Sequence, residues 1–388
     1  MAMNGPRVLR GVTVLVFLLV GLALGGSASA GSRILRMVPL VEHWDGSSWT
    51  QATVAPAGSS LDQLSAVVAP SATSVWAFGY TRYAQYWNGA AWKRVALPVP
   101  KGAEAPEFNG AAAVSPNDIW AFGDAELQGS TYAAHAIVDH WNGHAWRMVP
   151  SPPTRGYSRL LAATALSSTN VWAVGVVGVD SGNRVAERTL AVHWNGKVWK
   201  RVPSPNPATP YTPAGSIDDS LAAVAGDSPH DVWAVGQQYV VAADGEHSIH
   251  PLVLHWNGTR WKAVSSPDPA GPGHRSFLSG VVAPSPTGVW AVGSAVRHGT
   301  RWVQHALAEH WDGTSWQIVP TTDNPLTGVS GLSANDIWAA GGMTGGDVTH
   351  WDGSAWTVHT KLAHDDALTA VAEVSPTNVW AVGVRFVY

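Results

Sequence analysis

The chain has 388 residues, of which 13% are charged, with a formal net charge of −4 and no cysteine. This composition excludes a fold held by disulfide bonds, and it argues against a basic groove for nucleic acid, so no nucleic-acid partner is expected. The 40 Gly and 26 Pro residues would suggest disorder, but 22 Trp residues at regular spacing predict a packed, repetitive fold.

The N-terminus has the layout of a secretory signal peptide. Two arginines precede an apolar run, Val12–Leu24, which is followed by small residues ending at Ala30. We expect cleavage after Ala30, so that residues 1–30 are the signal peptide and residues 31–388 are secreted, outside the cell or at its surface, with no membrane segment. The alternative is an uncleaved N-terminal anchor, although the apolar run is shorter than a full membrane span.

The first repeated motif is an aromatic residue and Trp, then Asn-Gly or Asp-Gly, two variable residues and a second Trp. It occurs at His43–Trp49, Tyr86–Trp92, His140–Trp146, His193–Trp199, His255–Trp261, His310–Trp316 and His350–Trp356. Asn-Gly and Asp-Gly supply the positive φ angles of a type I′ turn in a two-residue hairpin. In one copy this register pairs Trp256 with Thr259 and Leu254 with Trp261. Both Trp residues would then lie on one face of the hairpin and His255 on the other.

The second repeated motif is Val-Trp-Ala or Ile-Trp-Ala, preceded by a turn and a run of small residues. It begins at Val75, Ile119, Val171, Val232, Val289, Ile337 and Val379. An apolar residue stands twelve positions before each of its Trp residues, and a Ser follows seven positions after that apolar residue. The three residues after this Ser are turn formers, so the motif predicts a second hairpin.

The two hairpins combine into four-stranded units. We name the strand of small residues A, the Val-Trp strand B, and the two halves of the Trp-Gly-Trp hairpin C and D. Six complete A-B-C-D units begin near Leu64, Phe108, Leu160, Leu221, Leu278 and Leu326. The remaining segments, C-D at His43–Val54 and A-B at Leu368–Val387, are complementary halves of a seventh unit. This pattern predicts an all-β fold, a seven-bladed β-propeller whose ring is closed by a shared blade.

The second residue after the start of each strand A supports a closed ring, because it is always small. These residues are Ala66, Gly110, Ala162, Ala223, Gly280, Gly328 and Ala370. Small side chains suit the innermost strands, which crowd around the axis. An open stack of repeats is the alternative, but it would more often carry polar end-caps, and none is visible in the sequence.

With these repeats the chain resembles secreted bacterial propeller proteins that carry Trp-x-Gly-x-x-Trp and Ser-x-x-Asp-Val-Trp-Ala-Val-Gly signatures. The resemblance covers nearly all of the mature chain and implies a propeller, but it implies no particular ligand. Sialidase, kelch and WD40 propellers are more distantly similar. The sialidase Asp box is not matched, because Asp312 stands directly before Gly313. The Gly doublet that kelch repeats carry in each blade occurs here after only one strand B. WD40 blades end in Trp-Asp, whereas Trp44-Asp45 leads into a turn.

The lengths of the connections indicate which face binds a ligand. The A–B and C–D turns have the same length in every unit. The B–C connections range from the six residues between Gly79 and Tyr86 to the eighteen between Gly236 and His255, and the D–A connections also vary. In a four-stranded meander the B–C and D–A connections emerge on the same face, so we expect binding there.

Polar residues near the expected mouth of the axial channel are the candidate ligand-binding residues. They are Asp62, Asp219, Asn324 and Asp366, two positions before strand A, Glu107 and Arg159, one position before it, and Asp124 after strand B. They would bind a cation or a polar ligand; the alternative is that they are solvated loop charges. Trp302, the one Trp outside the repeated motifs, is a further candidate.

A metal site is left open by the sequence. The His residues that precede Trp belong to different blades, so we expect them to pack rather than to bind a metal. No cofactor and no catalytic residues are predicted, because no Ser, His and acid stand at a recognisable catalytic spacing.

These observations favour a secreted, monomeric, non-enzymatic propeller that binds an extracellular protein or a polysaccharide. A second hypothesis is a sialidase-like glycoside hydrolase or lyase, which would need two carboxylates at a defined separation. A third is a structural cell-surface module without a specific ligand.

Overall fold

The computed structural model describes residues 36–55, 62–127, 134–152, 154, 156–180, 185–207, 217–241, 246–269, 275–298, 302–342 and 345–388. This described part is all β, with 28 strands. It contains no helix that is long and apolar enough to cross a membrane. The expected signal peptide, residues 1–30, lies outside the described residues.

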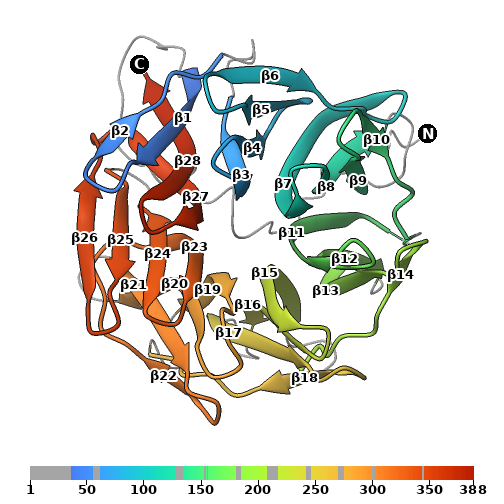
Figure 1. The fold of residues 1–388 in the computed structure, drawn as a ribbon. Helices are drawn as coiled ribbons and strands as arrows, with labels where there is room; N and C mark the ends of the chain where they lie inside the picture. Colours follow the sequence, from blue (N-terminus) through green and yellow to red (C-terminus); the bar gives the residue numbers. More distant parts are fainter. Residues whose placement is uncertain are drawn as a thin grey trace, which may run out of the picture.

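The strands form seven four-stranded antiparallel blades around a central axis (Figure 1), and one parallel bridge, between Ile249 and Arg275, additionally joins blades 4 and 5. Blades 1 to 3, each from its innermost strand outward, are β3 (Leu64–Ser71), β4 (Ser74–Gly79), β5 (Tyr83–Trp87) and β6 (Trp92–Ala96); β7 (Ala103–Ser115), β8 (Asp118–Leu127), β9 (His135–Trp141) and β10 (Trp146–Met148); and β11 (Ser158–Ser167), β12 (Asn170–Asp180), β13 (Val185–Trp194) and β14 (Trp199–Arg201). Blades 4 to 6 are β15 (Ile217–Ser228), β16 (Asp231–Val241), β17 (His247–Trp256) and β18 (Trp261–Val264); β19 (Arg275–Val282), β20 (Val289–His298), β21 (Trp302–Trp311) and β22 (Trp316–Ile318); and β23 (Leu326–Ser333), β24 (Asp336–Gly341), β25 (Asp347–Trp351) and β26 (Trp356–Lys361).

Blade 7 is built from both ends of the described chain. Its strands, from the axis outward, are β27 (Asp366–Ser375), β28 (Asn378–Val387), β1 (Arg36–Trp44) and β2 (Trp49–Gln51). Strand β1 pairs with β28 along its whole length, from Arg36 opposite Val387 to Trp44 opposite Val379. In Figure 1 the blue and red strands accordingly lie side by side. The prediction of a propeller closed by a shared blade is confirmed.

The Trp residues fill the spaces between neighbouring blades. Trp120 of β8, which is 1% exposed, stacks on His140 of its own blade with ring centres 4.1 Å apart. On its other side it meets the edge of Trp199 in blade 3 at 5.4 Å. The same contact joins blade 7 to blade 1, where Trp380 lies 5.3 Å from Trp92. Edge-to-face packing of large aromatic rings therefore holds each blade to the next around the whole ring.

The innermost strands approach one another closely, as the small residues predict. A Cβ atom added to Gly110 of blade 2 would lie 2.7 Å from the Cα of Ala162 in blade 3. One added to Gly328 of blade 6 would lie 2.8 Å from the Cα of Ala370 in blade 7. Backbone therefore packs directly on backbone around the axis, and a larger side chain at these positions would push the blades apart.

The prediction of type I′ turns in the C–D hairpins is wrong. Trp256 pairs with Trp261, so the loop has four residues rather than two. Gly258 has a positive φ of 88°, but Asn257 does not, because Ala105 is the only non-glycine residue with positive φ in the described part. The Asn257 Oδ1 atom instead accepts the backbone N–H groups of Thr259 and Arg260, both at 3.1 Å. This Asx-type turn still leaves both Trp residues on one face, as expected.

Candidate functional site

The two faces of the disc are built differently. On one face the C–D turns lie against the A–B turns of the same blade. The indole N–H of Trp44 donates to the carbonyl oxygen of Pro376 at 3.1 Å, and that of Trp194 donates to Ser168 at 3.2 Å. The other face carries the B–C and D–A connections. We call it the variable face.

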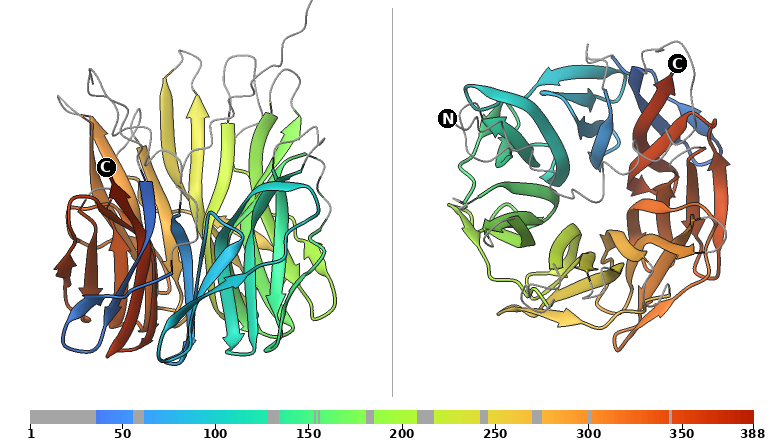
Figure 2. Two further views of the ribbon diagram at one scale, coloured as in Figure 1. Left: turned by 90° about the horizontal axis from the view of Figure 1, so that it is seen from above. Right: turned by 180° about the vertical axis from the view of Figure 1, so that it is seen from behind.

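Strand lengths differ strongly at the variable face. In blade 4, β16 and β17 have 11 and 10 residues, whereas β24 and β25 of blade 6 have 6 and 5. The long strands project beyond the rest of the ring on one side of the disc (Figure 2). Blade 1 is also low, with 6 residues in β4 and 5 in β5, beside the long strands of blades 2 and 3.

Three of the candidate residues from the sequence meet at this step between blades 1, 2 and 3. Glu107 of β7 and Asp124 of β8 are direct cross-strand partners in blade 2. Arg159 of β11, in blade 3, places its Nε atom 3.4 Å from the Asp124 Oδ2 atom. The side-chain amide of Asn109 also donates to Asp124, at 3.3 Å. The ion pair therefore joins two blades at the variable face.

Two further groups extend this site on either side. Tyr80, directly after β4, lies within electrostatic reach of Glu107, Asp124 and Arg159. Tyr157, just before β11, donates a hydrogen bond from its hydroxyl to Glu187 of β13. We define the rim cluster as Tyr80, Glu107, Asp124, Tyr157, Arg159 and Glu187.

Burial decides the protonation of the rim cluster. It raises the pKa of Asp124 to about 7, against the opposing effect of Arg159. It likewise raises the pKa of Glu187 to about 7, against the hydrogen bond from Tyr157, and it raises the pKa of Glu107. The carboxyl groups of Asp124 and Glu187 are therefore only partly ionised near neutral pH, and their protonated forms are hydrogen-bond donors.

The structure gives two of the other predicted residues partners within their own blades. Asp366, only 1% exposed, accepts two hydrogen bonds from Arg385 of β28, at 2.6 Å from Nε and 2.7 Å from Nη2. Asn324 donates to Asp347 of β25 at 3.0 Å. Each of these contacts lies within a single blade.

The remaining predicted residues are also placed. Asp219 is fully buried and accepts a hydrogen bond from Gln238 of its own blade at 3.3 Å. Asp62 is 4% exposed, and its backbone N–H lies 3.4 Å from the carbonyl oxygen of Met37. The backbone of Trp302 begins β21, but its side chain lies outside the described part of the structure.

A metal centre does not emerge from these positions. Among the described residues, no group of three or more His, Asp or Glu side chains is arranged to hold a metal ion. Five of the six His residues of strand C hydrogen-bond to the A–B turns instead. For example, His140 lies 2.7 Å from Asp118, and His255 lies 2.7 Å from Asp231.

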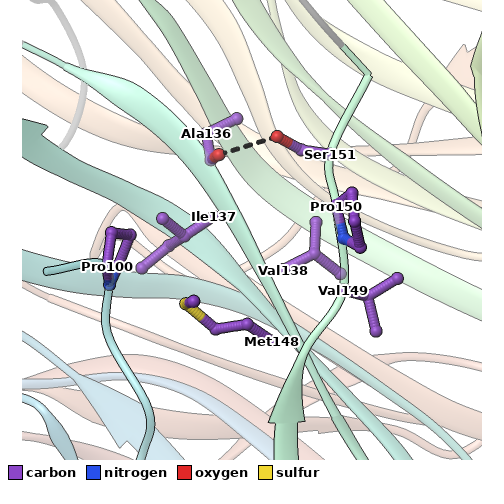
Figure 3. A pocket seen from close by; sticks show the side chains of 8 residues that line it. All are labelled: Pro100, Ala136, Ile137, Val138, Met148, Val149, Pro150 and Ser151. Carbon is purple, nitrogen blue, oxygen red and sulfur yellow. Dashed lines mark hydrogen bonds between the residues drawn. The ribbon is translucent and has the colours of Figure 1, made fainter.

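A cavity of about 270 Å³ lies at the outer strands of blade 2 (Figure 3). Its walls are mostly apolar, from Ile137, Val138, Met148 and Val149, and Pro100 closes one side. No charged residue lines it, and none of the rim-cluster residues does. It offers no group for acid–base chemistry.

Sequence reasoning missed part of the rim cluster. Tyr80 was detectable, since it follows Gly79 as Asp124 follows Gly123, so the two occupy equivalent positions in their blades. Tyr157 and Glu187 lie in connections of variable length, and no repeat position marks them. Only the strand extension of blade 3 brings them to Arg159.

No protein-family model matches the sequence, and no curated protein is similar to it. Solved β-propellers are similar in structure. YCF48 bound to D1 peptide has a TM-score of 0.52 and 12% identity, covering 94% of this chain and 100% of its own. YCF48 from Cyanidioschyzon merolae has a TM-score of 0.51 and 14% identity, with 83% and 93% coverage. The WD40 propeller domain of Doa1 has a TM-score of 0.50 and 10% identity, with 84% and 92% coverage. The likeness establishes the fold: the chain is a β-propeller.

Proposed function

We propose that the mature chain is a secreted, non-enzymatic binding propeller that holds an extracellular protein segment or polysaccharide at its variable face. The observation that carries this proposal is the rim cluster, which gathers polar side chains from three blades where the short strands of blade 1 meet the longer strands of blade 2. Scaffolds that vary their connections on one face usually bind ligands there.

The chemistry of the rim cluster supports a polar, uncharged or weakly anionic ligand. Partly protonated Asp124 and Glu187 can donate or accept hydrogen bonds, and the hydroxyl of Tyr80 adds another such group. The side chain of Arg159 is 21% exposed and supplies a fixed positive charge. Peptide carbonyls and sugar hydroxyls or carboxylates match such a set of groups.

Two further observations support the proposal. The N-terminal segment has the layout of a signal peptide, which would export the chain. YCF48, which has a similar fold, has been solved with a D1 peptide bound, so a propeller of this shape can hold a polypeptide segment.

A binding screen tests the proposal. Residues 31–388 would be applied to immobilised glycans and to tiled peptides, and the dissociation constant of each hit would be measured for Arg159→Gln and Tyr80→Phe. We expect Arg159→Gln to weaken binding by about tenfold or more, since one charge-assisted hydrogen bond contributes about 1.5–3 kcal/mol. His144→Gln, at an exposed position of a C–D turn on the opposite face, is the control. Binding that is lost in His144→Gln and kept in Arg159→Gln would show that the ligand lies on the face opposite the variable face, and would contradict the proposal.

One observation favours a second candidate, a glycoside hydrolase. Glu107 and Asp124 are direct cross-strand partners, a geometry in which Cβ atoms lie about 4.5–5.5 Å apart. Retaining glycosidases hold their two carboxyl groups about 5–5.5 Å apart, and a general acid needs a raised pKa such as that of Asp124. Release of reducing ends from a polysaccharide panel, abolished in Asp124→Asn and Glu107→Gln, would establish this activity. The absence of turnover on every glycan that binds would exclude it.

A further inference from the structure

Charge is unequally distributed around the outer edge of the ring. In blades 1 to 4 the C–D turn begins with Asn88, Asn142, Asn195 or Asn257, and in blades 5 to 7 it begins with Asp312, Asp352 or Asp45. The residue after the second Trp is Lys or Arg in blades 1 to 4, but Gln or Thr in blades 5 to 7. We define the basic arc as the Lys and Arg residues of the outer strands and C–D turns of blades 1 to 4. They are Lys93, Arg94, Arg147, Lys197, Lys200, Arg201, Arg260 and Lys262.

These residues form one continuous surface because their blades are neighbours. The outermost strands β6, β10, β14 and β18 follow one another around about half of the circumference in Figure 1. Strands β22, β26 and β2 occupy the other half. All eight residues lie in a C–D turn or within two residues of the second Trp, so they form a row along one edge of the disc.

The side chains of the basic arc face solvent. All eight residues are exposed. Within the described part of the chain, no ion pair involves Arg147, Lys200 or Lys262. Arg94 lies over the ring of Tyr83, 4.3 Å from its centre.

The acidic groups of the A–B turns in these blades do not neutralise the arc. Asp118 and Asp231 are each bound by the His of their own blade, at 2.7 Å, and are only about one-fifth exposed, at 19% and 20%. The C–D turns and outer strands themselves contain no acidic residue in blades 1 to 4. A negatively charged partner would therefore meet a row of cations.

The fold does not need these cations. Blades 5 to 7 have uncharged residues at the position that follows the second Trp, namely Gln317, Thr357 and Thr50. The equivalent residues of blades 2 to 4 are Arg147, Lys200 and Lys262. All of these positions pair with the aromatic residue of strand C in the same register. The positive side chains are therefore not required for the packing of the blade, and they set the charge of its surface.

We propose that the basic arc binds a linear anionic polysaccharide along the outer edge of blades 1 to 4. The arc is convex, so a flexible chain with regularly spaced charges can follow it. Double-stranded DNA fits poorly because its persistence length is about 150 bp and wrapping it costs several kcal/mol. Single-stranded nucleic acids need stacking platforms, and the arc adds no aromatic residue to the Trp pairs that every blade carries. This surface is independent of the rim cluster.

The experiment compares three proteins that differ in where their cations lie. The first is the mature wild-type chain, and the second is Arg147→Gln/Lys200→Gln/Lys262→Gln. Wild-type blade 5 already carries Gln317 at the equivalent position, so the fold accommodates this side chain. The third adds Thr50→Lys, Gln317→Lys and Thr357→Lys to these changes, which restores the net charge on blades 5 to 7. Each is titrated with polygalacturonate, with neutral dextran and with a single-stranded oligonucleotide at two salt concentrations.

We expect wild type to bind polygalacturonate and to lose affinity as salt rises, because counterions compete for the same charges. The triple Gln variant should bind about tenfold to a hundredfold more weakly, and the relocated variant should bind no better than it. Recovery of the affinity for polygalacturonate in the relocated variant would show that net charge, and not the position of the charges, determines binding. That result would overturn the proposal. Absence of binding to polygalacturonate, equal binding to dextran, or tighter binding to the oligonucleotide would also overturn it.

Discussion

The hydroxyl of Thr369 donates a hydrogen bond to the carbonyl oxygen of Leu64 at 2.7 Å, although the two residues are 305 positions apart in the sequence. The same hydroxyl lies 3.0 Å from the carbonyl oxygen of Val382 in its own blade. Thr369 is the bulged residue between Leu368 and Ala370, and the bulge directs its side chain toward blade 1. This contact links the last strands of the chain to the first complete blade, where the ring closes.

Replacing Thr369 with Val should weaken the closure of the ring. The two side chains have the same shape, so the change removes only the hydroxyl that serves two carbonyl groups. We expect the free energy of unfolding to fall by about 1–3 kcal/mol, measured by urea denaturation. Thr357→Val, at an exposed position of β26, is the control and should change stability by less than about 0.5 kcal/mol. Equal effects of the two substitutions would show that the contact does not stabilise the ring.

A second prediction concerns the C–D turns. Gly196 has a φ of +87°, and a Cβ atom there would lie 2.8 Å from the Cγ2 atom of Thr169 in the adjacent A–B turn. Gly196→Ala should therefore destabilise the protein by about 1–3 kcal/mol, measured as a loss of thermal stability. Lys197→Ala changes the next residue of the same turn, which is exposed, and should be nearly neutral. A neutral effect of Gly196→Ala would mean that the turn tolerates a different backbone conformation.

The sequence was sufficient to predict the architecture because each blade repeats the same packing requirement. A Trp such as Trp120 must be covered by the aromatic pair of the next blade, so the repeats specify a ring and its closure. The turn type was not predicted because Asn and Asp suit two conformations. Either residue tolerates positive φ, and either can accept backbone N–H groups with its side chain, as Asn257 does.

The candidate site was predicted only where it follows the repeat. Glu107, Asp124 and Arg159 flank the strands at positions fixed by the motif, and the structure brings these three together. Tyr157 and Glu187 belong to connections whose course depends on long-range packing, so no local pattern indicates their contact. The partner of each predicted acidic residue likewise depends on the neighbouring strand.

A third prediction concerns the pH dependence of stability. Asp139 of β9 is fully buried, and neither of its carboxyl oxygens has a hydrogen-bond partner within the described part of the structure. Burial raises its pKa to about 8. The folded protein therefore keeps this proton up to about pH 8, whereas an unfolded Asp releases it near pH 4. Because the folded state binds more protons in this range, the free energy of unfolding should fall as the pH rises from about 4 to 8.

Asp139→Asn should reduce this slope by up to about 1.4 kcal/mol per pH unit and should stabilise the protein at pH 8. Urea denaturation at several pH values measures both effects. Burial also raises the pKa of Glu309 to about 8, so Glu309 should preserve part of the slope. Asp352→Asn is a matched control, because Asn occupies that turn position in blades 1 to 4, and hydrogen bonds lower the pKa of Asp352 to about 2. An unchanged slope in Asp139→Asn would show that this carboxyl group does not hold the proton.

The last prediction separates two roles for Asp366. From the sequence it was expected to bind a cation together with other acidic residues at the mouth of the channel. In the structure its two carboxyl oxygens accept hydrogen bonds from Arg385, which lies opposite it in register. Asp366 is almost fully buried, so its removal would leave a guanidinium group without its charged partner.

We therefore expect Asp366→Asn to lower the free energy of unfolding by about 1–3 kcal/mol, because the amide cannot replace the two charge-assisted hydrogen bonds from Arg385, whose side chain is 35% exposed and keeps part of its hydration. Arg385→Gln should have a similar effect, and the double variant should lose clearly less than the sum of the two. A coupling energy of about 1–3 kcal/mol in this cycle would identify the ion pair as the function of Asp366. Additive losses, together with a calcium-dependent rise in the melting temperature of wild type that Asp366→Asn abolishes, would instead establish the cation site.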